Sequence, residues 1–208
     1  AVNEARILAR IKEALEEGNP VRSLEFNDED QKFVNQAQLL TSKEMLYIAN
    51  VGEDEIGDED NEKVKLIREY ASKEDSEVIV ISAKIEEEIA TLEDEDREMF
   101  LEDLGIEEPG LDRLIRTTYD LLGLATYFTA GVQEVRAWTF ISGMTAPQCA
   151  GIIHTDFERG FIRAEVTSYD DYVEFNGENG AKDAGKQRLE GKEYIMKDGD
   201  VVHFRFNV

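Results

Sequence analysis

Apolar and polar residues follow a helical spacing at the start of the chain. Between residues 2 and 16 the apolar side chains recur every three or four positions among charged residues, which predicts an amphipathic helix. Gly18-Asn19-Pro20 ends that helix, because glycine supplies a left-handed cap and proline cannot continue the helix. Asn27-Asp28-Glu29-Asp30 is an N-cap signal for a second helix that extends to about Leu39. The first helix, with one apolar face, is typical of the returning arm of a helical hairpin.

Two short apolar runs further along the chain predict buried strands. One runs from Met45 to Val51 and the other covers Glu77–Ile81. The helix predicted between them carries its apolar face on Val64, Leu66, Ile67 and Tyr70. The order strand, helix, strand implies parallel strands joined by a right-handed crossover.

Two acidic stretches are predicted to be solvated. Residues 54–61 are interpreted as a surface loop, and residues 85–98 as a solvated acidic face, because consecutive carboxylates on a helix point in different directions. The sequence therefore predicts no metal ligands there. A turn at 104–110 precedes a strong helix from about Leu111, and residues 121–129 are interpreted as the exit from this α/β unit. The predicted buried stripe of that helix is Leu111, Leu114, Ile115, Thr118, Tyr119 and Leu122.

From Val132 the pattern changes to that of a small α+β sheet crossed by a helix. Thr145-Ala146-Pro147 starts the helix, with proline in its first turn, and the helix reaches His154 or Phe157. The predicted strands are 135–140, 161–166, a further short one at 172–175, and a closing strand at 201–206; a small helix is predicted at 181–189.

Composition narrows the class of protein. The 208 residues carry a net charge of −24, and the acid lies mostly in residues 1–126, with 34 Asp and Glu against 14 Lys and Arg. This charge argues against a phosphate-binding surface spread over the whole chain. A lone cysteine, Cys149, cannot form an internal disulfide and fits a reducing, cytoplasmic setting. No signal peptide or apolar run of membrane-spanning length occurs, so no membrane partner is expected. The missing initial Met and the immediate helical pattern suggest a piece of a longer protein.

Polar residues at the ends of the two predicted strands are the candidate chemistry. Asn50 ends the first, with Glu53 three residues later, and the second runs into Ser82-Ala83-Lys84. This arrangement resembles the base-binding half of a GTPase-type site, which lies beyond the carboxyl ends of strands in an open sheet. An Asn amide offers a donor and an acceptor to a purine edge. Guanine-specific sites use Asp where this chain has Glu53, so the departure favours adenine. The alternative is a strand that happens to end in Asn before an acidic loop.

Longer matches identify a family. In the first half these are Tyr47-Ile48-Ala49-Asn50-Val51, Leu104 to Leu111, and Leu124-Ala125-Thr126-Tyr127-Phe128-Thr129-Ala130-Gly131. In the second half they are Ala137-Trp138-Thr139, Thr145-Ala146-Pro147-Gln148, Ile153 to Ala164, and Lys197-Asp198-Gly199-Asp200-Val201. Together they closely resemble YchF proteins, Obg-like P-loop NTPases known as Ola-type ATPases in eukaryotes. The resemblance covers essentially the whole chain.

The resemblance implies a fold and a function. Residues 1–18 would end a helical hairpin inserted into a nucleotide domain, 19–126 would be the C-terminal part of that α/β P-loop NTPase (G) domain, and 127–208 would be a TGS domain, an α+β ubiquitin-like β-grasp. Relatives hydrolyse ATP, in preference to GTP, with Mg²⁺, and are linked to the ribosome. The resemblance assigns base recognition to Asn50, the Val51 backbone, Glu53, Ser82, Ala83 and Lys84.

What this chain lacks matters equally. Before the first predicted strand it has no G-x-x-x-x-G-K-[ST] loop, no Asp-x-x-Gly switch and no catalytic-histidine loop of the family; His154 and His203 lie in the TGS region. Phosphoryl transfer depends on positioning and charge neutralisation around the γ-phosphate. We therefore predict no catalytic residue here and no ATP hydrolysis, with Mg²⁺ bound only through the missing P-loop half. His154 is expected to bond the turn it precedes, His203 to be a cross-strand partner, and Cys149 to be a packed thiol.

A rival hypothesis treats the chain as a stand-alone RNA, ribosome or protein interaction module without hydrolysis. Its RNA or partner contacts would come from basic residues of the TGS region, which also carries thirteen acids. Arg136, Arg159, Arg163, Lys182 and Lys186 are the main candidates, with Arg188 and Lys192. Mixed surface charge remains the alternative interpretation. Sheet and hairpin surfaces left by the missing half would favour a homo-oligomer of this piece.

Overall fold

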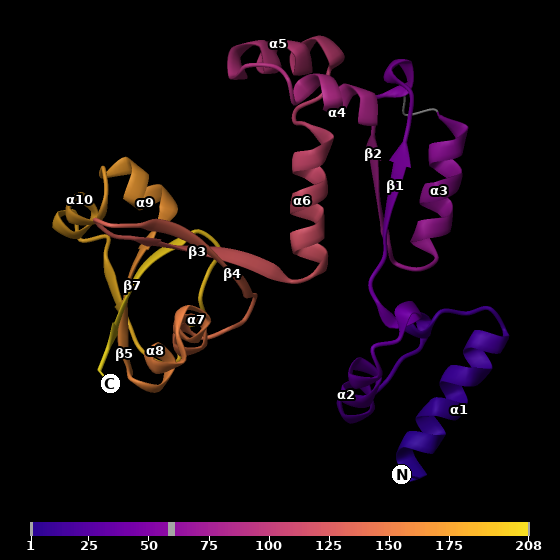
Figure 1. The fold of residues 1–208 in the computed structure, drawn as a ribbon, viewed down its shortest axis with the longest axis horizontal. Helices are drawn as coiled ribbons and strands as arrows, with labels where there is room; N and C mark the ends of the chain where they lie inside the picture. The colour runs from indigo at the N-terminus through magenta and orange to yellow at the C-terminus, as the bar shows by residue number, and fades with distance from the viewer. Residues whose placement is uncertain (1, 58–60, 208) are drawn as a thin grey trace. The chain divides into compact units, whose positions relative to one another are not determined.

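A computed structural model describes residues 2–57 and 61–207. The chain divides into two compact units, one up to Arg116 and one from Thr117, and each is described by itself (Figure 1). The predicted domain boundary at 126/127 lies within a strand of the second unit, whereas the division between units lies within a helix. In the described part of the chain, no helix is long and apolar enough to cross a membrane.

The first unit begins with two helices that share an apolar cluster. α1 covers Val2–Glu16 and α2 covers Asp28–Ala37, both as predicted. Buried side chains of Ile7 and Ile11 pack with Val21 and Val34. The Asn27 side chain caps α2 by accepting from the N–H groups of residues 29 and 30. α1 therefore has a partner in α2, which the hairpin-arm interpretation did not foresee.

A two-stranded parallel sheet follows, as the apolar runs predicted. β1 (Leu46–Asn50) pairs with β2 (Glu77–Ile81) in a register that sets Asn50 opposite Ile81. α3 (Glu62–Ser72) connects them. Val64 and Ala71 are its buried residues, whereas Leu66 and Tyr70 are exposed, so the predicted apolar face of α3 was too broad. Part of the predicted loop at 54–61 lies outside the described residues; what is described includes a 3₁₀ turn at Glu53–Glu55.

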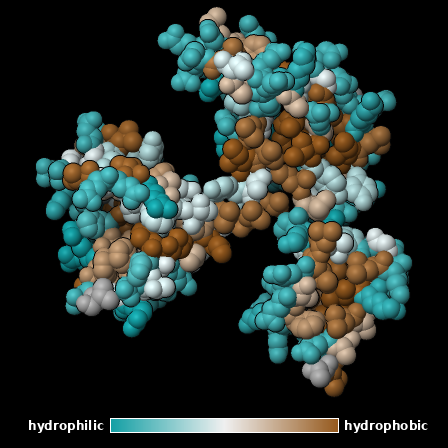
Figure 2. Space-filling view, viewed as in Figure 1, coloured by the Kyte–Doolittle hydropathy of each residue, from teal (hydrophilic) through white to brown (hydrophobic). Residues whose placement is uncertain are grey.

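Three helices complete this part of the chain. α4 (Ala83–Ile89) and α5 (Asp94–Leu104) bury Ile85, Ile89 and Leu101 together. α6 spans Gly110–Leu121. The expected buried stripe of α6 is wrong at Leu111, Ile115 and Leu122, which are each more than half exposed. An apolar stripe is buried only when another element packs along it. Figure 2 shows apolar residues gathered on this face, over β1, β2 and α6.

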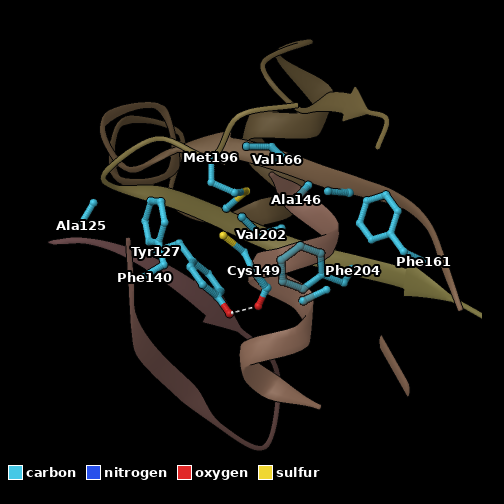
Figure 3. Packing of buried hydrophobic residues seen from close by; sticks show 12 residues of the cluster. Ala125, Tyr127, Phe140, Ala146, Cys149, Phe161, Val166, Met196, Val202 and Phe204 are labelled. Atoms are coloured by element: carbon cyan, nitrogen blue, oxygen red, sulfur yellow. Dashed lines mark hydrogen bonds between the residues drawn. The ribbon is translucent and has the colours of Figure 1, made fainter. Parts of the chain in front are cut away.

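The second unit is a five-stranded sheet in the order β4-β3-β7-β5-β6. Its strands are β3 (Leu124–Ala130), β4 (Val135–Ile141), β5 (Phe161–Ser168), β6 (Arg188–Glu190) and β7 (Asp200–Phe206). Its helices are α7 (Ala146–Ile153), α8 (Thr155–Arg159), α9 (Tyr169–Glu174) and α10 (Glu178–Asp183). Figure 3 shows the core, in which Tyr127, Phe140 and Phe204 surround Cys149 of α7.

Three sequence predictions fail in this unit. Residues 121–129 are not merely an exit, because 124–130 form β3, an interior strand that pairs with β4 and β7. The short strand predicted at 172–175 lies instead in and just after helix α9, which Ser168 caps by accepting from Asp171 N–H. The helix predicted at 181–189 is replaced by the earlier, shorter α10 and then by strand β6.

Candidate functional site

The candidate base site is built where β1 and β2 end together. Because the strands are parallel and in register, the residues after Asn50 and after Ile81 leave the sheet at the same edge. Asn50 Oδ1 accepts a hydrogen bond of 3.0 Å from Ala83 N–H, which ties the two loops together. The Asn50 side chain is exposed beyond the strand. Its Nδ2 group therefore remains available as a donor at the sheet edge.

One of the two backbone groups of Val51 is engaged within the sheet. Its N–H donates to Ile81 O over 2.9 Å and so extends the strand ladder by one bond. The Val51 N–H is therefore already hydrogen-bonded, and the Val51 carbonyl is the backbone group that could contact a ligand. Adenine offers a 6-amino donor that a carbonyl can accept, so the backbone of Val51 suits adenine through its oxygen.

Glu53 and Lys84 form an ion pair across the two loops. The hydrogen bond and the charge of Glu53 raise the pKa of the Lys84 ammonium. Both side chains are largely exposed, so the pair adds little to stability. Glu55, not Glu53, folds back on the loop by accepting from Gly52 N–H over 3.0 Å, and this leaves Glu53 to reach Lys84.

Ser82 contributes a buried polar atom that lacks a partner. The residue is 1% exposed, and its Oγ has no hydrogen bond within the described residues. A buried hydroxyl without a partner costs free energy unless a ligand or water satisfies it. The N–H groups of Lys84 and Ile85 in the first turn of α4 also lack partners within their helix. The site therefore presents several donors beside one unsatisfied hydroxyl.

Glu86 is a residue that sequence reasoning missed. It lies in the acidic stretch interpreted as a solvated face, yet its carboxylate accepts from Gly110 N–H at 2.7 Å and Leu111 N–H at 3.1 Å. It thus caps α6 and links that helix to the base loop. A Cβ at residue 110 would lie 2.7 Å from Ile81 Cγ2, so only glycine fits there. The signal in the sequence was Pro109-Gly110 at a helix start.

A large open cavity of about 830 Å³ lies elsewhere in the first unit. It is bordered by α3, by the segment before α6, and by Val80 of β2. None of the six candidate base-binding residues lines it. Lys65, Arg68 and Arg113 face it together with Glu107 and Glu108, so its wall carries both signs of charge.

The candidate RNA-contacting residues are spread over the second unit. Arg136 stacks over the Trp138 ring at 4.0 Å, and Arg163 lies 3.7 Å from Glu165. Lys186 pairs with Asp171 at 3.0 Å, which raises the pKa of the lysine. Carboxylates or a ring thus engage three of the five, and Arg159 and Lys182 lie on α8 and α10.

His154, Cys149 and His203 behave as their patterns indicated, and two aromatic residues join the core. His154 Nδ1 accepts from Asp156 N–H at 3.1 Å and so caps α8, which confirms its structural role. Cys149 is fully buried, and burial raises the pKa of its thiol to about 12. Phe140 is in the core and Trp138 packs against it. His203 is the cross-strand partner of Glu165.

The α/β fold of this chain matches part of the fold of GTPase structures, as comparison with known proteins shows. The chain is similar to the Schizosaccharomyces pombe YchF GTPase, with a TM-score of 0.85, 32% identity, and 98% of this chain aligned to 54% of that one. A GTP binding protein from Pyrococcus horikoshii OT3 aligns over 100% of this chain and 57% of its own, with a TM-score of 0.58; at 18% identity it shows the fold alone.

Sequence comparison is more specific. The model of the family YchF-GTPase_C, described as a protein of unknown function (DUF933), matches residues 124–207. The "Ribosome-binding ATPase YchF" of Bacillus subtilis (strain 168) is 65% identical over 100% of this chain and 57% of the relative. Its counterpart in Haemophilus influenzae is 56% identical over 99% of this chain and 56% of the relative. The chain belongs to the YchF family, and it spans somewhat more than half the length of these relatives.

Proposed function

We propose that this chain supplies the base-recognition part of an ATP-binding, ribosome-associated YchF protein, together with its TGS domain. The observation that carries the proposal is the bond from Ala83 N–H to Asn50 Oδ1, which joins the two loops into one site. The names of the relatives support ATP and the ribosome as ligand and partner.

The preference for adenine follows from the hydrogen-bonding groups at the sheet edge. Guanine selection needs a free carboxylate to accept from the ring N1–H and the exocyclic 2-amino group, but Glu53 is engaged by Lys84. Adenine needs a donor and an acceptor on its edge, which Asn50 Nδ2 and the Val51 carbonyl provide. The stem of Lys84 would lie along the base plane. GTP would bind more weakly because its 2-amino group would find no acceptor.

Phosphate and Mg²⁺ binding need other residues. This sequence contains no P-loop, and Mg²⁺ with the phosphates would be held by residues of a P-loop half. Phosphate contacts usually supply much of the affinity, so adenine nucleotides should bind this chain weakly and without hydrolysis. The chain's own part is to orient the base.

Nucleotide binding by the 208-residue chain tests the proposal. We expect weak binding of ATP, weaker binding of GTP, and loss of ATP binding in Asn50→Ala, measured by calorimetry. Asn35→Ala is the matched control, since Asn35 is an exposed residue of α2 whose side chain is bonded only to Gln31 among the described residues. ATP affinity that is equal in Asn50→Ala and in the unmodified chain would refute base recognition at this site. Phosphate release clearly above a blank in a malachite-green assay would refute the absence of hydrolysis.

A second candidate function is that of an interaction module. The second unit has its own core, formed entirely by residues 125 to 204, and the family model matches this unit. Ribosomal RNA binding should weaken steeply as salt rises, and Arg163→Ala and Lys186→Ala should each weaken it as well, if these basic residues contact phosphates. If both variants were retained on ribosomal RNA as well as the unmodified chain, this result would count against the candidate.

A further inference from the structure

Three side chains with metal-ligating groups converge on the second unit. The ligand atoms of Glu165, Glu178 and His203 all lie within 4.8 Å of one another. They belong to β5, α10 and β7, which are far apart in the sequence. We propose that Glu165, Glu178 and His203 form a binding site for a divalent transition-metal ion, with Zn²⁺ as the best-fitting ion.

The sheet register brings two of the ligands together. Glu165 and His203 are directly opposite each other on the antiparallel pair β5 and β7, so their side chains leave the same face of the sheet. Their neighbours Ala164, Val166, Val202 and Phe204 are buried in the core on the other face. The pair therefore lies on the face away from α7, and the register rigidly fixes its spacing.

The third ligand, Glu178, follows a turn at Gly177. Gly177, with φ of +106°, directs the chain into α10, whose first residue is Glu178. That φ is unfavourable for other residues, so the turn is specific to glycine. A cavity of about 10 Å³ lies at this point, lined by all three ligands and by Thr167 and Tyr172. This is about the space that one small ion or one water occupies.

Both carboxylates are oriented by an outer partner. Arg205 Nη2 donates to Glu165 Oε2 at 2.9 Å, and Gln187 Nε2 donates to Glu178 Oε1 at 3.2 Å. The bond to Glu178 leaves its Oε2 for an ion, and the hydrogen bond from Arg205 leaves Glu165 Oε1, which lies 3.7 Å from Arg163 Nη2 and would have to exchange that longer ion pair for the metal. Metal-ligating carboxylates characteristically have such a second shell. The Glu165 side chain is only 10% exposed, whereas no hydrogen bond or ion pair engages the His203 ring in the part of the chain described here.

The charges around the cluster set its affinity. Glu165 and Glu178 contribute two negative charges. Two arginines lie near Glu165 and offset part of this charge, Arg205 at 2.9 Å and Arg163 at 3.7 Å. The cationic partners reduce attraction for a dication, so we expect binding in the micromolar range rather than tighter. An alternative without metal is an ion-pair network in which Arg205 and Arg163 neutralise Glu165.

The donor set selects the kind of ion. One imidazole nitrogen and two carboxylate oxygens suit Zn²⁺, with bonds of about 2.0–2.2 Å and a water as fourth ligand. Mg²⁺ and Ca²⁺ prefer six or more oxygens, which this site does not supply. Since the ligand atoms now spread over as much as 4.8 Å, they would move closer together by about 1 Å on binding.

Zn²⁺ titration of the chelator-treated 208-residue chain, in competition with a chromogenic chelator, tests the site. We expect one Zn²⁺ per chain, not displaced by millimolar Mg²⁺ or Ca²⁺. Glu178→Gln and His203→Ala should each weaken binding about tenfold or more. His154→Ala is the matched control, because His154 is the only other histidine of the sequence and lies outside the cluster. Its affinity should be unchanged.

Two further measurements keep the test decisive. Circular dichroism of each variant establishes that it is folded, and the imidazole NMR signals of His203 should shift on Zn²⁺ addition while those of His154 do not. The proposal is overturned by a dissociation constant weaker than about 100 μM, which marks only non-specific association. It is equally overturned by full affinity in folded His203→Ala, by displacement with Ca²⁺, or by an unshifted His203 signal.

Discussion

At the scale of residues, Cys149 shows how packing controls chemistry. Its thiol is fully buried among Tyr127, Phe140 and Phe204, and burial raises its pKa to about 12. The reactive thiolate is therefore almost absent at neutral pH. We expect no reaction of the folded chain with a disulfide reagent at pH 8 over minutes, and one thiol per chain once urea unfolds it. Rapid labelling of the folded chain would show that the core opens there.

The same shift predicts a dependence of stability on pH. The pKa of the Cys149 thiol is higher in the folded chain than in the unfolded chain. The free energy of unfolding that the neutral thiol contributes is therefore fully present below about pH 8.5 and is lost as pH rises towards 12. The free energy of unfolding of the second unit should therefore fall over this range. Cys149→Ala should lose less stability between pH 8 and 11 than the unmodified chain does, when both are measured by urea unfolding at each pH. An equal loss in both would exclude the thiol as the cause.

At the scale of elements, local patterns predicted some features and tertiary contacts decided others. β1 and β2 were found because each is a short apolar run, and parallel pairing followed from the helix between them. Residues 172–175 were predicted as a short strand because three of the four are apolar, but the cap at Ser168 starts a helix that includes 172–174. The base-site candidates came from strand ends in register. Glu86 was missed because its role depends on where α6 begins. Glu178 likewise becomes a neighbour of Glu165 and His203 only through the fold.

The cap on α6 gives a prediction at this scale. Glu86→Ala removes the acceptor for two N–H groups, and loss of such a cap costs about 0.5–2 kcal/mol of unfolding free energy. Glu87→Ala, one residue along the same acidic run and exposed, should change stability by less than about 0.5 kcal/mol. Urea unfolding followed by circular dichroism measures both. Similar effects of the two variants would restore the interpretation of this stretch as merely solvated.

At the scale of the whole molecule, the two units have separate apolar clusters. The core around Tyr127 and Phe140 uses only residues 125–204, whereas the clusters around Ile7 and Ile85 use residues of the first unit alone. Separate cores imply separate unfolding transitions. The single tryptophan, Trp138, stacks on Tyr127 in the second unit, so its fluorescence reports that unit only. Circular dichroism reports helices of both units.

We therefore expect tryptophan fluorescence and circular dichroism to give different urea midpoints. Phe140→Ala should lower the fluorescence midpoint, since a buried Phe→Ala change costs about 3–5 kcal/mol, and should leave the other phase in place. Ile85→Ala, with a cost of about 2–5 kcal/mol in the first unit, should act on the dichroism phase and leave fluorescence unchanged. If both variants shifted both signals together, the units would unfold as one body. A substitution at the base site could then change the stability of the second unit, and one at the metal site that of the first. Each control variant would have to be measured for both binding activities.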